Sequence, residues 1–278
     1  SDETISDIRA RISGGTIFIG HGHKISVAVV GVGSLKSVSD AQATAANLAI
    51  DIAMYDQSGC LSPQNVWIES GCVVSPGRFA GMLSEELARM ADALPLGKLS
   101  AEQAAAILAF RSEYEFRSAQ DLASRVSASG APSAGVSDQR LRRPKCRSLR
   151  VRPDAGRCYF GDRLSYSVIV DPDPSFCPTP LGRTVLVKPM RQRGEWAGCL
   201  SGVAGHLQGV GAAPVQDFRE VFEDCRKLGT SYFCEIGRMQ RPPIDRQNGG
   251  VPCLRSLLID SSFFNFTSSP PAGGRGLR

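Results

Sequence analysis

The chain has 278 residues, of which 42% are hydrophobic and 21% charged, a composition typical of a soluble globular protein with one large or two small domains. Lysine and arginine outnumber the acidic residues by only 32 to 27, and no recognisable module accompanies them, so the charge does not indicate nucleic-acid binding. No apolar run approaches the roughly 20 residues of a membrane span, and the first residues resemble neither a signal peptide nor a transit peptide. We therefore expect no stable membrane insertion.

The nine cysteines are an odd number at wide spacings, and none forms a Cys-x-x-Cys pair. The three histidines do not lie at zinc-ligand intervals beside cysteines, so the sequence predicts no metal site. This pattern favours a reduced, cytoplasmic protein in which most thiols are structural. The cysteines interpreted in this way are Cys72, Cys158, Cys177, Cys199, Cys225, Cys234 and Cys253.

Hydrophobic patterns of helices and strands alternate through the first quarter of the chain. The expected elements are, in order, a helix over 5–12, strands over 16–19 and 25–32, a helix over 41–54 with Asp40 at its start, and a strand over 65–69. The helix over 41–54 is apolar on almost every side, which predicts a buried helix.

The alternation continues through the rest of the chain. The expected elements are helices over 76–94 and 101–123, an irregular segment over 124–138, strands over 164–170, 183–187 and 207–210, a helix over 214–228 and a strand over 231–236. Ser100 and Gln103 form a capping box at the start of the second of these helices. Strands that alternate with helices of this length predict an α/β fold.

Residues 140–152 are rich in arginine and lysine and contain no acid. The favoured interpretation is a solvated linker, since most charge runs are solvated. The alternative is a segment that attracts an anionic substrate, such as the phosphates of coenzyme A.

The candidate site is the stretch Tyr55–Gln64, in which Cys60 lies in a polar turn between the apolar helix and a strand. Such a turn holds one thiol still at the mouth of a cleft, so we predict that Cys60 is a nucleophile that takes up an acyl group. Asp56 and Gln57 are expected to position the turn by hydrogen bonds to its backbone, with Gly59 and Ser62 completing it.

The motifs around Cys60 occur in a known order: a glycine turn, a basic residue, a Ser-x-Ala strand, an Ala-rich helix and a cysteine turn. The matching residues are Gly22, Lys24, Ser26, Ala28 and the run Asp56-Gln57-Ser58-Gly59-Cys60-Leu61-Ser62-Pro63, with further matches at 178–185, 207–211 and 237–243. In these motifs the chain resembles the long-chain acyl-CoA reductases, a branch of the aldehyde dehydrogenase superfamily that includes the fatty-acid reductase subunit of bacterial luminescence. The resemblance covers most of residues 1–260, is poor over 124–156 and is absent after 260.

The resemblance implies a mostly parallel sheet flanked by helices and a two-step reduction. The Cys60 thiolate attacks an acyl thioester and releases coenzyme A, and a nicotinamide then reduces the acyl-enzyme to a fatty aldehyde. The implied cofactor is NADPH, with NADH possible. The implied partners are an acyl-CoA or acyl-protein substrate, an acyl-protein synthetase, and further copies of the complete protein in a homo-oligomer.

One departure concerns a glutamate base of the aldehyde-oxidising members, whose position matches Gly20. No acid occurs between Gly15 and Asp40, which agrees with reduction rather than hydrolysis of the acyl-enzyme. A second departure concerns the cofactor-binding domain, which the resemblance places largely before Ser1. We expect residues 1–19 to be its remnant, with Ser1 as a cofactor contact, 20–260 to be the catalytic domain with an irregular excursion over 124–156, and 261–278 to be a disordered tail.

The chain is therefore expected to be an incomplete portion with little reductase activity alone. The alternatives are an acyl-accepting module that does not reduce, an inactive fragment, and an acyl-phosphate reductase, which the Cys-Leu-Ser-Pro run disfavours. Among the other polar residues, His21 and His23 are interpreted as turn residues that contact the backbone, and the alternative is that one of them is a general base. His206 is interpreted as structural. Arg183 is expected to pair with a buried carboxylate rather than with a phosphate.

Overall fold

The computed structural model describes residues 2–14, 16, 18–71, 73–129, 156–244, 246–248 and 251–252. The expectations for Ser1, for the basic run at 140–152 and for the tail after 260 lie outside these residues. In the part that is described, no helix is long and apolar enough to cross a membrane.

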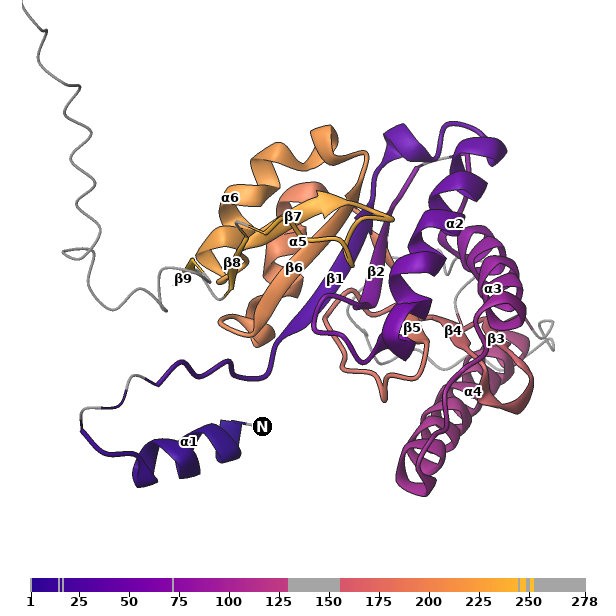
Figure 1. Ribbon diagram of the computed structural model, residues 1–278. Helices are drawn as coiled ribbons and strands as arrows, with labels where there is room; N and C mark the ends of the chain where they lie inside the picture. Colours follow the sequence, from indigo (N-terminus) through magenta and orange to yellow (C-terminus); the bar gives the residue numbers. More distant parts are fainter. Residues whose placement is uncertain are drawn as a thin grey trace, which may run out of the picture.

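A seven-stranded sheet forms the centre of the molecule (Figure 1). Its spatial order is β3-β4-β5-β2-β1-β6-β7, and all pairs are parallel except β3 with β4. The strands are β1 Ile25–Val30, β2 Pro63–Glu69, β3 Cys158–Phe160, β4 Ser167–Val170, β5 Thr184–Met190, β6 Leu207–Ala213 and β7 Tyr232–Glu235. A separate pair, β8 Gln247–Asn248 and β9 Val251–Pro252, is antiparallel. The α/β fold with a mostly parallel sheet is thus confirmed.

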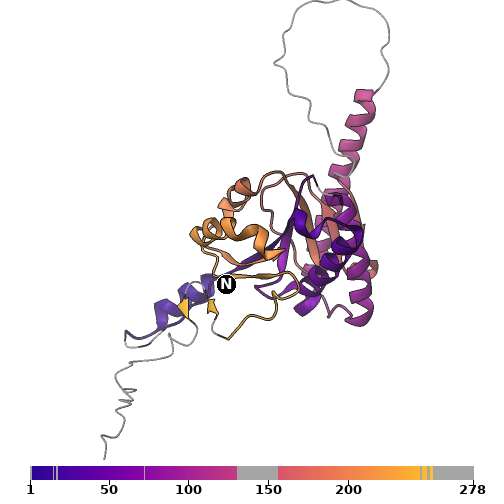
Figure 2. The same cartoon turned by 90° about the horizontal axis from the view of Figure 1, so that it is seen from above.

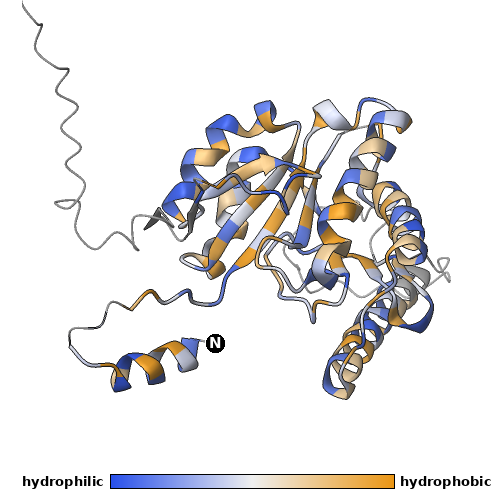
Figure 3. Ribbon diagram, in the orientation of Figure 1, coloured by the Kyte–Doolittle hydropathy of each residue, from blue (hydrophilic) through white to orange (hydrophobic). Residues whose placement is uncertain are grey.

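The helices cover both faces of this sheet. They are α1 Asp2–Arg11, α2 Val38–Ala53, α3 Pro76–Ala93, α4 Ala101–Ser129, α5 Arg193–Cys199 and α6 Arg219–Lys227. Side chains of α2 and α3 pack on one face, whereas α5 and α6 cover the β1–β6 half of the other face and α4 covers the β4–β5 half. Figure 2 shows the last turns of α4 projecting beyond the sheet, and Figure 3 shows apolar strands between helices whose outer surfaces are hydrophilic.

The position of strand β1 inside the sheet explains why its sequence is apolar without interruption. Ala28 and Val30 face α2 and α3, while Val27 and Val29 face α5 and α6, because successive side chains of a strand point to opposite faces. A parallel strand that is covered on both faces has no solvent-facing position, and every residue of β1 is accordingly buried.

Four local expectations differ from the structure. Residues 16, 18 and 19 form no strand, because this segment runs beside α1 outside the sheet and has no strand to pair with (Figure 1). Helix α4 continues to Ser129 rather than 123, since no glycine or proline interrupts it before Gly130. The N-cap of α2 is Ser37, whose Oγ accepts from the Asp40 N–H. Helix α5 was not expected, because two glycines break its apolar pattern.

A buried ion pair joins α4 to the sheet. The Lys188 side chain of β5 is fully buried, and its Nζ donates to Asp171 Oδ2 at 2.6 Å and to the Asp173 carbonyl at 2.9 Å. Tyr114 of α4 donates its hydroxyl to the same Asp171 oxygen at 3.0 Å. Burial and the neighbouring Asp171 raise the pKa of Tyr114 well above its usual range, so the phenol stays a donor at physiological pH.

Replacing Lys188 by Met should lower the free energy of unfolding by about 3 kcal/mol or more, because the Asp171 carboxylate would remain buried without its cation. Urea denaturation measures this change. Lys227→Met is the matched control, since Lys227 forms an exposed pair with Asp224, and it should leave the denaturation midpoint unchanged. Equal effects of the two substitutions would contradict the prediction.

Candidate functional site

Cys60 lies at the edge of the sheet where the parallel strands begin. It follows α2 and the short 3-10 turn Met54–Gln57, and it precedes β2. The amino ends of parallel strands share one edge, so the residues that precede β1, β5 and β6 lie at this edge as well. The Cys60 thiol is exposed, whereas the other cysteines in the described part of the chain are half-buried or buried.

Two left-handed turns meet beside Cys60. Tyr55, Asp56 and Gln57 have φ angles of 54°, 52° and 64°. A second run before β5, over residues 181–183, has φ angles of 64°, 61° and 60° and ends at Arg183. Non-glycine residues avoid this region because Cβ approaches the backbone, at a cost of the order of 1–3 kcal/mol each. Both turns therefore need contacts that hold them.

The two turns supply these contacts to each other. Arg183 Nη2 lies 2.6 Å from Asp56 Oδ1. The Gln57 amide donates to the carbonyls of Pro63 and Thr184 at 2.8 and 2.9 Å and accepts from the Thr184 N–H at 2.8 Å. Arg183 thus pairs with a carboxylate as expected, although Asp56 is half-buried rather than buried. The second Asp56 oxygen accepts from the Gly97 N–H, so Asp56 acts on the turn through Arg183 rather than through the turn's own backbone.

Arg183 is fully buried, and its Nε and Nη1 have no hydrogen-bond partner among the described residues. The ion pair with Asp56 is therefore the contact that compensates for the burial of this charge. Removing either partner would leave a charge on a strained turn next to the candidate nucleophile.

Two further hydrogen bonds hold the cysteine turn itself. Ser26 of β1 donates its hydroxyl to the Cys60 carbonyl at 2.7 Å. Gln240 Nε2 donates to Ser62 Oγ at 3.0 Å, and a Cβ at Gly59 would lie 3.4 Å from Gln240 Oε1. The small side chains at 59 and 62 thus leave room for Gln240. Sequence reasoning noted the motif that contains Gln240 but assigned no contact to it.

Asp51 connects α2 to the segment that carries Gln240. Its carboxylate is fully buried and accepts from the N–H groups of Gly237 and Met239 at 2.5 and 3.1 Å, while its carbonyl accepts from Gln240 at 3.2 Å. Burial raises the pKa of Asp51 to about 6, although these backbone hydrogen bonds and the charge of Arg241 oppose the shift.

The side chains of β2 hold the connection between β4 and β5. The Asn65 amide exchanges two hydrogen bonds with the backbone of Cys177, at 2.7 and 3.1 Å. Gln64 Oε1 accepts from the Thr179 N–H, and Trp67 Nε1 donates to the Pro174 carbonyl. Residues 171–183 therefore run along β2 from its carboxyl end back to the edge where Cys60 lies.

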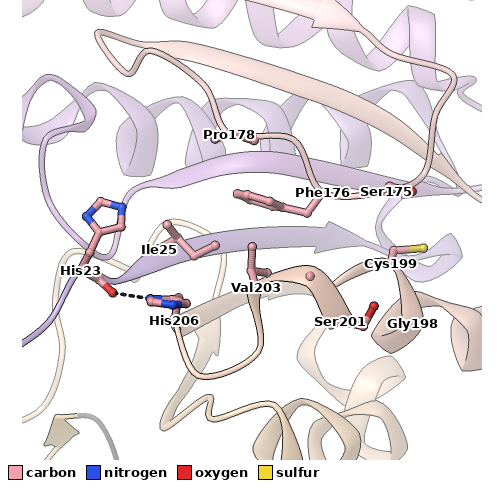
Figure 4. A pocket seen from close by; sticks show the side chains of 11 residues that line it. His23, Ile25, Ser175, Phe176, Pro178, Gly198, Cys199, Ser201, Val203 and His206 are labelled. Atoms are coloured by element: carbon pink, nitrogen blue, oxygen red, sulfur yellow. Dashed lines mark hydrogen bonds between the residues drawn. The ribbon is translucent and has the colours of Figure 1, made fainter. Parts of the chain in front are cut away.

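A cavity of about 630 Å³ opens at the same edge (Figure 4). It lies over the beginnings of β1 and β6, on the face that α5 covers. His23 and His206 line one end, where His206 Nδ1 lies 3.1 Å from the His23 carbonyl. The expected structural role of His206 thus includes a contact with His23, which lies just before β1.

The opposite edge of the sheet, at the carboxyl ends of the strands, is where a nicotinamide cofactor would be expected in an open α/β sheet. Gly31 and Gly33 follow β1 and precede α2, where dinucleotide-binding proteins carry a phosphate-binding turn. Glu69 Oε2 accepts from the Val32 N–H at 2.9 Å, and a Cβ at Gly33 would lie 2.9 Å from Asp217 Oδ2. Arg193 pairs with both carboxylates. Two carboxylates thus stand where a phosphate would bind.

The first turn of α1 does not fit a phosphate either, because it carries Asp2 and Glu3. Neither of these two helix starts therefore offers a phosphate-binding turn for a dinucleotide, and Ser1 lies outside the described residues. The same residues contain no group of three or more potential metal ligands.

A family model described as acyl-CoA reductase (LuxC) matches residues 1–153 and 143–259. The chain belongs to this family, which confirms the resemblance seen in the sequence. No curated protein sequence matches it.

Some solved structures are similar to this chain at low identity. The bifunctional proline utilization A protein is 11% identical with a TM-score of 0.54, covering 90% of this chain and 22% of its own. A 1-pyrroline-5-carboxylate dehydrogenase from Thermus is 13% identical with a TM-score of 0.45, and the match covers 85% of this chain and 42% of that protein. An NAD-dependent aldehyde dehydrogenase from Burkholderia multivorans is 15% identical with a TM-score of 0.48, and the match covers 78% of this chain and 36% of that protein. The chain thus spans less than half the length of these structures.

The raised pKa of Asp51 makes a pH-dependent prediction. The folded state binds a proton that the unfolded state has lost between pH 3.8 and about 6, so Asp51 lowers stability as the pH rises through this window. The stability of the wild type relative to Asp51→Asn should fall by about 2 kcal/mol from pH 4 to pH 6.5 and then remain nearly constant, since one pKa unit is worth about 1.4 kcal/mol. Chemical denaturation at several pH values measures it, and a difference that does not change with pH would contradict it.

Gln57→Leu should lower the free energy of unfolding by about 3 kcal/mol, because it leaves two buried carbonyls and one buried N–H without partners. Gln192→Leu is the control, since Gln192 is exposed and makes no capping hydrogen bond. If both variants unfold at the same denaturant concentration, the turn does not depend on the Gln57 amide.

Proposed function

We propose that this chain takes an acyl group from an acyl thioester onto Cys60, as the first half of the reduction of a long-chain acyl-CoA to a fatty aldehyde. The observation that carries the proposal is an exposed thiol on a turn that an ion pair and an amide hold in a strained conformation. Such strain at a nucleophile is typical of catalytic sites. Membership of the acyl-CoA reductase family supplies the substrate class.

The proposed step is a thioester exchange. The Cys60 thiol loses its proton to water, and the thiolate attacks the carbonyl carbon of the acyl-CoA. Backbone N–H groups of the turn stabilise the oxyanion that forms. The bond between the carbonyl carbon and the coenzyme A sulfur then breaks, the leaving thiolate takes up a proton, and the acyl group remains on Cys60. No electrons are transferred in this step.

In the reductase reaction, NADPH or NADH would supply the hydride that releases the aldehyde. The β1–α2 loop and the first turn of α1 offer no phosphate-binding turn for such a cofactor. The filled loop at Gly31 and Gly33 instead favours a second candidate function, an acyl-accepting module that does not reduce. The first candidate, the reductase, also implies an acyl-protein donor and a homo-oligomer.

The test is incubation with a radiolabelled long-chain acyl-CoA, followed by hydroxylamine treatment. We expect a hydroxylamine-labile label on Cys60 and a loss of at least about 100-fold in the labelling rate for Cys60→Ala, since the nucleophile is absent. Cys199→Ala is the control, because Cys199 is half-buried and burial raises the pKa of its thiol, and it should label as the wild type does.

Label that persists on Cys60→Ala would overturn the proposal. Oxidation of NADPH with release of fatty aldehyde would favour the reductase over the acyl-accepting module. Label without aldehyde would favour the module.

A further inference from the structure

The cysteine turn is a β-turn, and one side chain from the far end of the chain contacts both of its ends. The Ser62 N–H donates to the Gly59 carbonyl at 2.9 Å, so Cys60 and Leu61 are the two central residues. Gln240 Nε2 donates to Ser62 Oγ at 3.0 Å, and Gln240 Oε1 lies 3.4 Å from the place that a Cβ at Gly59 would take. The Gln240 amide therefore bridges the first and last residues of the turn that presents the thiol.

The same amide is also fixed to the last turn of α2. Gln240 Nε2 donates to the Asp51 carbonyl at 3.2 Å, and a carbonyl can only accept, so the nitrogen of the amide and not its oxygen faces α2. An amide nitrogen carries two hydrogens, and both are used, one on Asp51 and one on Ser62. Gln240 therefore ties the end of α2 to the cysteine turn that follows it.

The Asp51 carboxylate holds the backbone segment on which Gln240 stands. One of its oxygens accepts from the Gly237 N–H and the other from the Met239 N–H. Gly237 has a φ of 92°, and a Cβ there would lie 2.9 Å from Asn47 Cβ, so the approach of this segment to α2 requires a glycine. The Met239 side chain is fully buried. The segment is thus fixed on α2, and its position there brings Gln240 to the turn.

From these contacts we propose that Gln240 is a positioning residue for the acyl transfer, and that the Asp51 carboxylate supports it. Gln240 clamps the two ends of the turn, so that the thiol and the backbone N–H groups beside it keep one arrangement. A nucleophile reacts faster when its geometry is set before the substrate arrives. The proposal rests on the proposed function for its reaction, and it assigns a role to two residues that act on Cys60 through its turn.

The clamp depends on the ionisation of Asp51. Both carboxyl oxygens accept fully from an N–H only when the group is ionised, and protonation weakens one of the two contacts that hold the segment. Arg241 of the same segment and Tyr232 and Cys234 of β7 are the titratable or charged groups that face Asp51 in the described part of the chain. Burial raises the pKa of Tyr232 and the pKa of Cys234, so both are neutral near pH 6, and an arginine is always charged. A change in the clamp near pH 6 therefore reports Asp51.

The first experiment measures the labelling of Cys60 by dodecanoyl-CoA in the full chain. Gln240→Met keeps the length of the side chain but removes both hydrogen bonds, so the labelling rate at saturating acyl-CoA should fall at least about tenfold, with the half-saturating concentration unchanged. Gln192→Met is the control and should label as the wild type does, since Gln192 is exposed and follows β5 at the opposite edge of the sheet. Equal rates in the two variants, or a change in the half-saturating concentration alone, would overturn the proposal.

The second experiment compares the wild type with Asp51→Asn from pH 5 to pH 8, and it carries the test if Gln240→Met does not fold. Asparagine offers one acceptor oxygen, as protonated Asp51 does, so the ratio of wild-type to variant labelling rates should rise about fivefold as Asp51 ionises. Ionisation of Asp51 lowers the stability of the fold in the same window, so a residue that served the fold alone would not give this rise. A ratio that falls or does not change with pH would overturn the proposal.

Hydrogen exchange separates this proposal from the proposed function, because it needs no acyl-CoA. In Gln240→Met, the Ser62 N–H should exchange at least about fivefold faster than in the wild type, since the turn opens more often, and mass spectrometry of a peptide that contains Cys60 and Ser62 measures it. Faster exchange in a chain whose Cys60 takes no label would overturn the acyl transfer and leave the clamp in place. Unchanged exchange would overturn the clamp, whether or not Cys60 takes the label.

Discussion

The pairing of two left-handed turns, one before β2 and one before β5, is the constraint on which the site depends. Neither turn is stable by local preference, since most of their residues are not glycine. The Asp56–Arg183 ion pair and the Gln57 amide hold them, and the Arg183 and Gln57 side chains are buried while Asp56 is half-buried. The turn before Cys60 is thereby held by two residues that lie 127 positions after Asp56 and Gln57 in the chain. A nucleophile held in this way pays little entropy when it meets its substrate.

The sheet has two edges with different uses. In open α/β sheets ligands usually bind at the carboxyl ends of the strands, where the strand order reverses. In this protein that place, between β1 and β6, is filled by Glu69, Asp217 and the arginine that pairs with both. The exposed thiol and the 630 Å³ cavity lie at the opposite edge. The long return of residues 171–183 along β2 connects the two edges and forms one wall of that cavity.

Local patterns predicted much of the fold. The uninterrupted apolar run of β1, the Pro-containing first turn of α3 and the capping box at Ser100 each depend on neighbours within a few residues, and each is present as expected. The strand expected over 16–19 was wrong, because a strand exists only where another strand accepts its hydrogen bonds. The contact of Gln240 with the cysteine turn was missed, because its partner Ser62 lies 178 residues away.

The sequence by itself determined that the chain alternates helices and strands, that one cysteine stands in an acyl-CoA reductase motif, and that Arg183 needs a carboxylate. The first conclusion follows from residue spacing, the second from the resemblance to a known family, and the third from the chemistry of a single side chain. Only the tertiary structure decided which carboxylate that is, which edge carries the thiol, and that a cavity opens at the same edge. The physical reason is that buried charges and strained turns are compensated by partners from distant strands, and the folded sheet alone brings those partners together.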